Sequence, residues 1–88
     1  MAAPKISLYT KQHCAFCVRA KRLLDRKGVA YEEIDVEQQD HLRKWLAETT
    51  GQQTLPQIFA GDRPLGGYSD LAALDAAGQL DPILRGAP

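Results

Sequence analysis

Apolar and polar residues alternate near the start of the chain, and this period of two predicts a β-strand. Ile6 and Leu8 are separated by polar Ser7, so we expect a first strand over residues 5–10. The same alternation over residues 30–36 predicts a second strand. Two more strands are expected over residues 54–60 and 63–65. Gly61-Asp62 between them is typical of a two-residue hairpin.

The spacing of apolar residues changes to that of a helix after the first strand. From about Cys14 onward, one helical face collects Cys17, Ala20, Leu23 and Leu24. Gly28 is expected to end this helix, because glycine readily adopts the left-handed conformation found there.

Two further helices and a final turn are expected in the rest of the chain. The second helix has an apolar stripe that includes Trp45, which is therefore expected in the core, and it stops at Gly51. A third helix is expected from about Ser69 to Ala77. Asp81 is expected to cap a last turn over residues 82–85, with proline at its first helical position.

The order of these elements, β-α-β-α-β-β-α, predicts an α/β fold with a four-stranded mixed sheet flanked by helices. A helical crossover makes the first two strands parallel, and the hairpin makes the last two antiparallel. This is the thioredoxin-like arrangement. With 88 residues the chain is expected to form a single domain, residues 1–88.

Composition narrows the function classes. The 11 Lys and Arg residues balance the 11 Asp and Glu residues, which argues against nucleic acid or a membrane surface as a general partner. We find no apolar stretch long enough for a signal peptide or a membrane span, so we expect a cytoplasmic, monomeric protein. In such a reducing compartment, the two cysteines need a role other than a structural disulfide.

Cys14 and Cys17 lie where the first strand gives way to the first helix. The free N–H groups and the dipole of a helix start favour a negative charge there, and Lys11 and His13 add positive charge. These features favour the thiolate that attacks disulfides. We therefore expect Cys14 to attack and Cys17, one turn on and better buried, to resolve.

Two other roles for the cysteines stay open from the residues alone. A zinc site would have only His13 and His41 to add as ligands. Alternatively, both cysteines are inert core residues. Covalent haem attachment is excluded, because Val18 stands where a histidine must follow the second cysteine.

Three blocks make the chain resemble the short bacterial glutaredoxins over nearly its whole length. They are residues 9–17 (YTKQHCAFC), residues 54–56 (TLP) and residues 66–70 (GGYSD). The resemblance implies a glutathione-dependent disulfide oxidoreductase that reduces protein disulfides and glutathione mixed disulfides. Glutathione is then the reductant and co-substrate, and the other partners are disulfide-bonded or glutathionylated client proteins.

The resemblance also implies a glutathione site. Leu55, before a cis proline at Pro56, would pair its backbone with the cysteinyl part of glutathione, which amounts to strand addition. The helix start at Ser69 and Asp70 would hold the γ-glutamyl group. The full set of expected glutathione-binding residues is Lys11, Phe16, Arg43, Thr54, Leu55, Pro56, Gly67, Tyr68, Ser69 and Asp70.

The chain departs from the common glutaredoxin centre, Cys-Pro-Tyr-Cys, at Ala15 and Phe16. Family members without that proline sometimes hold a [2Fe–2S] cluster between two subunits. A first alternative function is therefore a cluster carrier, in which Cys14 and glutathione are the ligands and two chains share one cluster. A second alternative is a redoxin reduced by thioredoxin reductase, although Lys11 and Asp70 argue for a glutathione groove.

Overall fold

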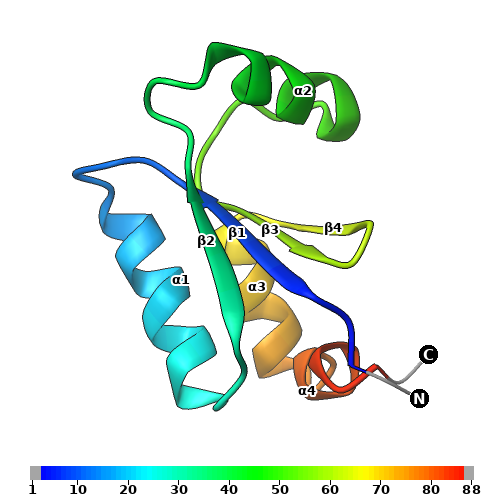
Figure 1. The fold of residues 1–88 in the computed structure, drawn as a ribbon. Helices are drawn as coiled ribbons and strands as arrows, with labels where there is room; N and C mark the ends of the chain where they lie inside the picture. Colours follow the sequence, from blue (N-terminus) through cyan, green and yellow to red (C-terminus); the bar gives the residue numbers. More distant parts are fainter. Residues whose placement is uncertain (1–2, 87–88) are drawn as a thin grey trace.

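The computed structural model describes residues 3–86 as a four-stranded sheet flanked by helices (Figure 1). Its elements are β1 (Ile6–Thr10), α1 (Ala15–Arg26), β2 (Tyr31–Asp35), α2 (Asp40–Thr50), β3 (Gln57–Ala60), β4 (Arg63–Gly66), α3 (Tyr68–Ala76) and α4 (Leu80–Leu84). The strands lie in the order β2-β1-β3-β4. Strand β1 runs parallel to β2 and antiparallel to β3, and β3 and β4 form the expected hairpin. The mixed sheet expected from the sequence is therefore confirmed.

One hydrophobic core joins α1, α3 and α4 to one face of the sheet. Leu8 and Ile58 point from the sheet into this core, where both are fully buried. The helices supply Ala20, Leu23, Leu24, Leu71, Leu80 and Leu84. Because the core fixes α1 and α3 against the same sheet face, it also fixes where their first residues lie.

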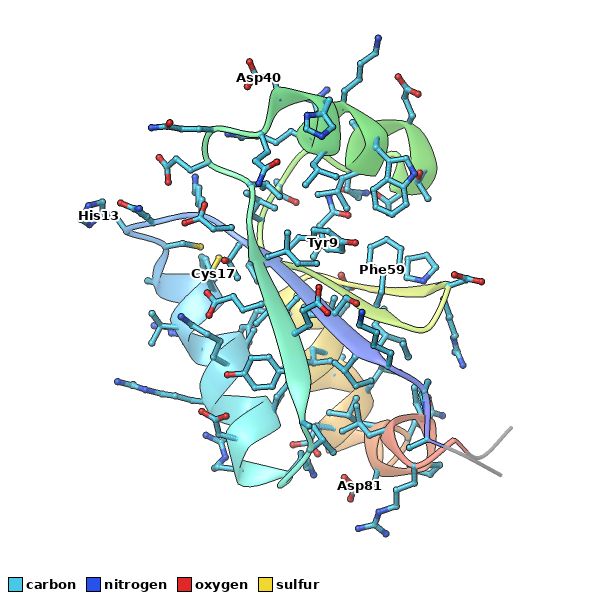
Figure 2. The ribbon with its side chains drawn as sticks, viewed as in Figure 1. Tyr9, His13, Cys17, Asp40, Phe59 and Asp81 are labelled. Atoms are coloured by element: carbon cyan, nitrogen blue, oxygen red, sulfur yellow. The ribbon has the colours of Figure 1, made fainter. Side chains whose placement is uncertain are left out.

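The opposite face carries an aromatic cluster beneath α2. The Trp45 ring stacks on the Phe59 ring, with the ring centroids 5.8 Å apart. The Tyr9 and Phe59 rings pack edge to face, with centroids 5.5 Å apart. Figure 2 shows Tyr9 and Phe59 on this part of the sheet. Trp45 is nevertheless 43% exposed, so its expected place in the core is wrong. Its ring covers Phe59, but nothing in the described chain covers its outer side.

Two elements begin more than one residue away from their expected starts. Strand β3 begins at Gln57, three residues later than expected, because Thr54–Pro56 form an irregular segment rather than part of the ladder. Helix α4 begins at Leu80, so Asp81 lies inside it and is not its N-cap. The Asp81 carboxylate instead pairs with Lys27 at 3.0 Å, which ties α4 to the end of α1. Within residues 3–86, no helix has both the length and the apolar character needed to cross a membrane.

Candidate active site

Cys14 is the N-cap residue of α1. Its backbone is extended, and its sulfur accepts a hydrogen bond from the backbone N–H of Cys17 at 3.2 Å. An N-cap side chain normally satisfies one of the free N–H groups of a helix start, and here a sulfur takes that position. No acidic residue lies in the first turn of α1. The Cys17 N–H and the positive end of the helix dipole both face the sulfur, and such surroundings favour a thiolate.

The environment of Cys17 is different. Its side chain is 2% exposed, whereas Cys14 is partly exposed, and both cysteines are free thiols. Burial raises the pKa of the Cys17 thiol to about 12, and its hydrogen bond to Cys14 acts in the same direction. At neutral pH Cys17 is therefore a protonated thiol. The difference in burial between the two cysteines agrees with that expected from their helix positions.

This difference predicts how Cys17 reacts in a Cys14→Ser variant, where the serine hydroxyl keeps a hydrogen-bonding partner beside it. At pH 8 its alkylation by iodoacetamide should be at least about tenfold slower than that of a free cysteine, because burial keeps the thiol protonated. The alkylation rate, followed by mass spectrometry, should rise with a midpoint above the ordinary cysteine value. The urea-unfolded variant is the control and should titrate near the ordinary cysteine value. A midpoint near that ordinary value in the folded variant would contradict the assignment.

A groove of about 610 Å³ lies beside Cys14. The sulfur of Cys14 donates to the backbone carbonyl of Leu55 at 3.8 Å, and the Leu55–Pro56 peptide is cis, as expected. Eight of the expected glutathione-binding residues line this groove: Phe16, Thr54, Leu55, Pro56, Gly67, Tyr68, Ser69 and Asp70. The start of α1 and the segments that follow α2 and β4 thus meet along one hollow.

The far end of the groove is the N-terminus of α3. The Asp70 carboxylate accepts a hydrogen bond from the backbone N–H of Gly67 at 3.0 Å and so caps the helix. Phe16 and Tyr68 stack at 6.2 Å between ring centroids, and together they form an aromatic side of the groove. Free N–H groups and a carboxylate therefore lie at one end, with the cysteine sulfur at the other.

Three candidate residues lie away from this groove. Lys11 lines a second hollow of about 630 Å³, which Cys14 and Cys17 also border. His13 is exposed at the loop between β1 and α1, and Figure 2 shows its ring directed away from Cys17. Arg43, on the exposed side of α2, lines neither hollow. Within residues 3–86, no group of three or more His, Cys, Asp or Glu side chains is arranged to hold a metal ion.

The sequence did not single out Gln57, which holds the loop before the cis proline. Its side chain is buried, and its amide nitrogen donates to the carbonyls of Gln52 at 2.8 Å and Thr54 at 3.1 Å. Its amide oxygen accepts from the Thr50 hydroxyl at 3.0 Å. The loop that carries Thr54 and Leu55 is thus fixed by one side chain of β3.

Gln57→Leu should therefore damage both stability and the groove. Leucine has a similar volume but leaves the two loop carbonyls without their partner, at a cost of about 1–3 kcal/mol of unfolding free energy. We also expect a raised KM for glutathione, because the Leu55 backbone loses its fixed position. Urea unfolding and steady-state kinetics measure the two effects. Gln53→Leu, at an exposed position in the same loop, is the matched control and should change neither. Equal KM values for both variants would contradict this role of Gln57.

The comparison with known proteins gives a consistent result. Residues 6–65 match the family model described as Glutaredoxin. The chain is 46% identical over 81 residues to a glutaredoxin of Pseudomonas aeruginosa, covering 92% of this chain and 96% of the relative. It is 42% identical over 80 residues to glutaredoxin 3 of Escherichia coli K12, covering 91% and 96%.

Solved glutaredoxin structures have a fold similar to that of this chain. The buckwheat glutaredoxin–glutathione complex matches with a TM-score of 0.87 and 31% identity, covering 92% of this chain and 76% of that chain. The solution structure of glutaredoxin from Brucella melitensis matches with a TM-score of 0.86 and 41% identity, covering 97% and 92%.

Proposed function

The chain belongs to the glutaredoxin family and is a thiol–disulfide oxidoreductase, and from this premise we propose that it uses glutathione to reduce protein–glutathione mixed disulfides and protein disulfides. The observation that carries the proposal is Cys14 at the N-cap of α1, with its sulfur against the Leu55 carbonyl. The buckwheat relative was solved with glutathione, which supports the same ligand here.

In the first step the Cys14 thiolate attacks the glutathione sulfur of a mixed disulfide. The bond between the two sulfurs of the substrate breaks, and a Cys14–glutathione disulfide forms. The client leaves as a thiolate and takes a proton from water. The client cysteine is thus reduced, and the disulfide passes to Cys14. Attack on the glutathione sulfur requires that the glutathione part lies in the groove beside Leu55.

In the second step a second glutathione thiolate attacks the glutathione sulfur on Cys14. Oxidised glutathione leaves and the Cys14 thiolate is regenerated. In the overall reaction, one mixed disulfide and one glutathione are converted to one client thiol and one oxidised glutathione. For a client disulfide, Cys14 first attacks one client sulfur and the other client sulfur leaves as a thiolate, which takes a proton from water. Cys17 then attacks the Cys14 sulfur, its proton passes to the departing client thiolate, and two glutathiones reduce the Cys14–Cys17 bond to give oxidised glutathione. The raised pKa of Cys17 supports this order, because a protonated, buried thiol is a poor first nucleophile.

The groove complements the cysteinyl and γ-glutamyl parts of glutathione. The Leu55 backbone pairs with the cysteinyl residue, and the N–H groups of Ser69 and Asp70 receive the γ-glutamyl carboxylate. The Asp70 carboxylate already accepts from Gly67, but a carboxylate has several acceptor sites and can also take the γ-glutamyl ammonium. Lys11 lies on the other side of Cys14, where its charge favours the thiolate and the glycyl carboxylate.

Trapping the intermediate tests this proposal. A Cys17→Ser protein treated with oxidised glutathione should gain one glutathione per chain, and added glutathione should remove it, as followed by intact-protein mass spectrometry. Cys14→Ser, which keeps the buried thiol, should gain none. A Cys17→Ser protein that gains no glutathione would contradict the proposed chemistry.

A second candidate function, carriage of a [2Fe–2S] cluster, is favoured by the exposure of Cys14 and of Ala15 beside it. Four-sulfur ligation would need Cys14 from two chains and two glutathione thiolates. After anaerobic reconstitution with iron, sulfide and glutathione, Cys17→Ser should be coloured and dimeric, and Cys14→Ser colourless. Ala15→Pro should lower the yield by stiffening the start of α1. Visible spectroscopy and gel filtration measure this, and a colourless, monomeric wild-type protein would rule the function out.

A further inference from the structure

The outer face of α1 carries a row of arginines, none of which forms an ion pair with the residues that the structure describes. Arg19, Arg22 and Arg26 follow one another at spacings of three and four, which places them on one side of the helix. All three are exposed. The ion pairs within residues 3–86 engage Lys5, Lys21, Lys27 and Lys44, but none of these arginines. We call Arg19, Arg22 and Arg26 the arginine row.

The arginine row begins beside the reactive sulfur. Ala15 directly follows Cys14 and is exposed, and Val18 is 40% exposed one turn further on. Phe16 is 55% exposed, and the Arg19 guanidinium lies 5.3 Å from the centre of its ring. An apolar surface next to Cys14 thus continues into a cationic one, which ends at Arg26, about 18 Å along the helix from Cys14.

Carboxylates do little to offset this charge. The first turn of α1 has no acidic residue, and Asp25, near its C-terminal end, is the one acidic residue of this helix. Asp25 interacts with Tyr31 of β2 and helps to raise the pKa of that phenol. The charge of the whole chain is zero, so the arginine row is a local feature and not part of a general basic surface.

We propose that the arginine row, with Ala15 and Val18, is a docking surface for client proteins whose reacting cysteine is followed or preceded by an acidic segment. This inference rests on the proposed function, since it concerns the client half of the mixed disulfide. Glutathione would occupy the groove formed by Leu55, Tyr68 and Asp70. The client chain must therefore extend from the Cys14 sulfur in a direction away from this groove. About six extended residues of client would reach from Cys14 to Arg26. Acidic side chains on that segment complement the arginines and raise the rate of encounter.

Two glutathionylated peptides test the docking surface. They share one sequence around the cysteine, but one carries three aspartates within six residues of it and the other three lysines. The wild-type protein should turn over the acidic peptide with a kcat/KM about tenfold higher at low salt. The preference should largely vanish at 1 M salt, where charges are screened within about 3 Å.

Variants of the row separate docking from chemistry. Arg22→Glu combined with Arg26→Glu should reverse the preference, and the milder pair Arg22→Gln and Arg26→Gln should remove it without adding charge opposed to the helix dipole. Arg85→Glu, at an exposed arginine after α4, is the matched control and should keep the wild-type preference. Turnover of the mixed disulfide of glutathione with 2-mercaptoethanol, which has no charged client part, should be equal in all of these proteins.

Each outcome bears on one claim. An unchanged peptide preference in both double variants, or an equal loss in Arg85→Glu, would overturn the docking surface. So would competition by a single-stranded oligonucleotide as strong as that by the free acidic peptide, because the row would then bind polyanions in general. Failure of the wild-type protein to turn over even the uncharged disulfide would refute the proposed function instead.

Discussion

Cys14→Ser should lower the turnover of a glutathione mixed disulfide by at least about 10³-fold, as expected when a covalent nucleophile is removed. The fold should survive, because serine is a good N-cap residue and its hydroxyl can accept the Cys17 N–H that the sulfur now accepts. Initial rates at saturating glutathione measure the loss, and the thermal midpoint should stay close to that of the wild-type protein.

Cys17→Ser is the matched comparison and should keep most of the turnover. The mixed-disulfide route needs only the Cys14 sulfur, and Cys17 is buried with a pKa of about 12. On a client disulfide, in contrast, Cys17→Ser should slow release of the product. Equal losses in both variants on the mixed disulfide would mean that both sulfurs are obligatory.

Gly66→Ala should raise the KM for glutathione about tenfold or more, because it disturbs Asp70. Gly66 has a φ of 97°, and a Cβ there would collide with the Asp70 carboxylate. Alanine at such a φ costs roughly 1–2 kcal/mol by itself. The collision adds the loss of the Gly67–Asp70 hydrogen bond, which positions the carboxylate at the end of the groove. Steady-state kinetics with varied glutathione measure the KM, and urea unfolding measures the strain.

Gly78→Ala separates the strain from the collision. Gly78 has a φ of 72°, but a Cβ there would meet no atom within 4 Å. We expect this variant to lose only the roughly 1–2 kcal/mol due to the backbone strain and to keep the wild-type KM. If Gly66→Ala also kept the wild-type KM, Asp70 would have no part in holding glutathione.

Much of this site could be predicted from the sequence because it depends on local patterns. The alternation around Ile6 and Leu8 and the helical spacing after Cys14 are enough to place a cysteine at a strand-to-helix junction. The start of α1 is then a property of consecutive residues, and so is the cap formed by Asp70 three residues after Gly67.

The features that were missed depend on packing between distant segments. Gln57 looks like a surface residue of a strand, but β3 lies between β1 and β4 and is buried along its whole length. Its amide therefore has to find partners in the loop that follows α2. The periodicity of α2 places Trp45 on the apolar side of the helix. The burial of its ring depends on how far the sheet extends beneath it, which the helical pattern does not show. Lys11 follows β1 directly, but only the fold determines on which side of Cys14 its side chain lies.

Glutathione, bound beside Cys14, is the proposed reductant, and a coupled assay shows whether it is. The rate of NADPH oxidation is measured with a glutathionylated peptide, glutathione and glutathione reductase, and again with thioredoxin reductase and no glutathione. In the first mixture we expect a rate of NADPH oxidation that is proportional to the protein concentration, saturates with the peptide and is far above the rate with glutathione alone. In the second mixture we expect no NADPH oxidation. A rate equal to that of glutathione alone, or turnover driven by thioredoxin reductase without glutathione, would contradict this role of glutathione.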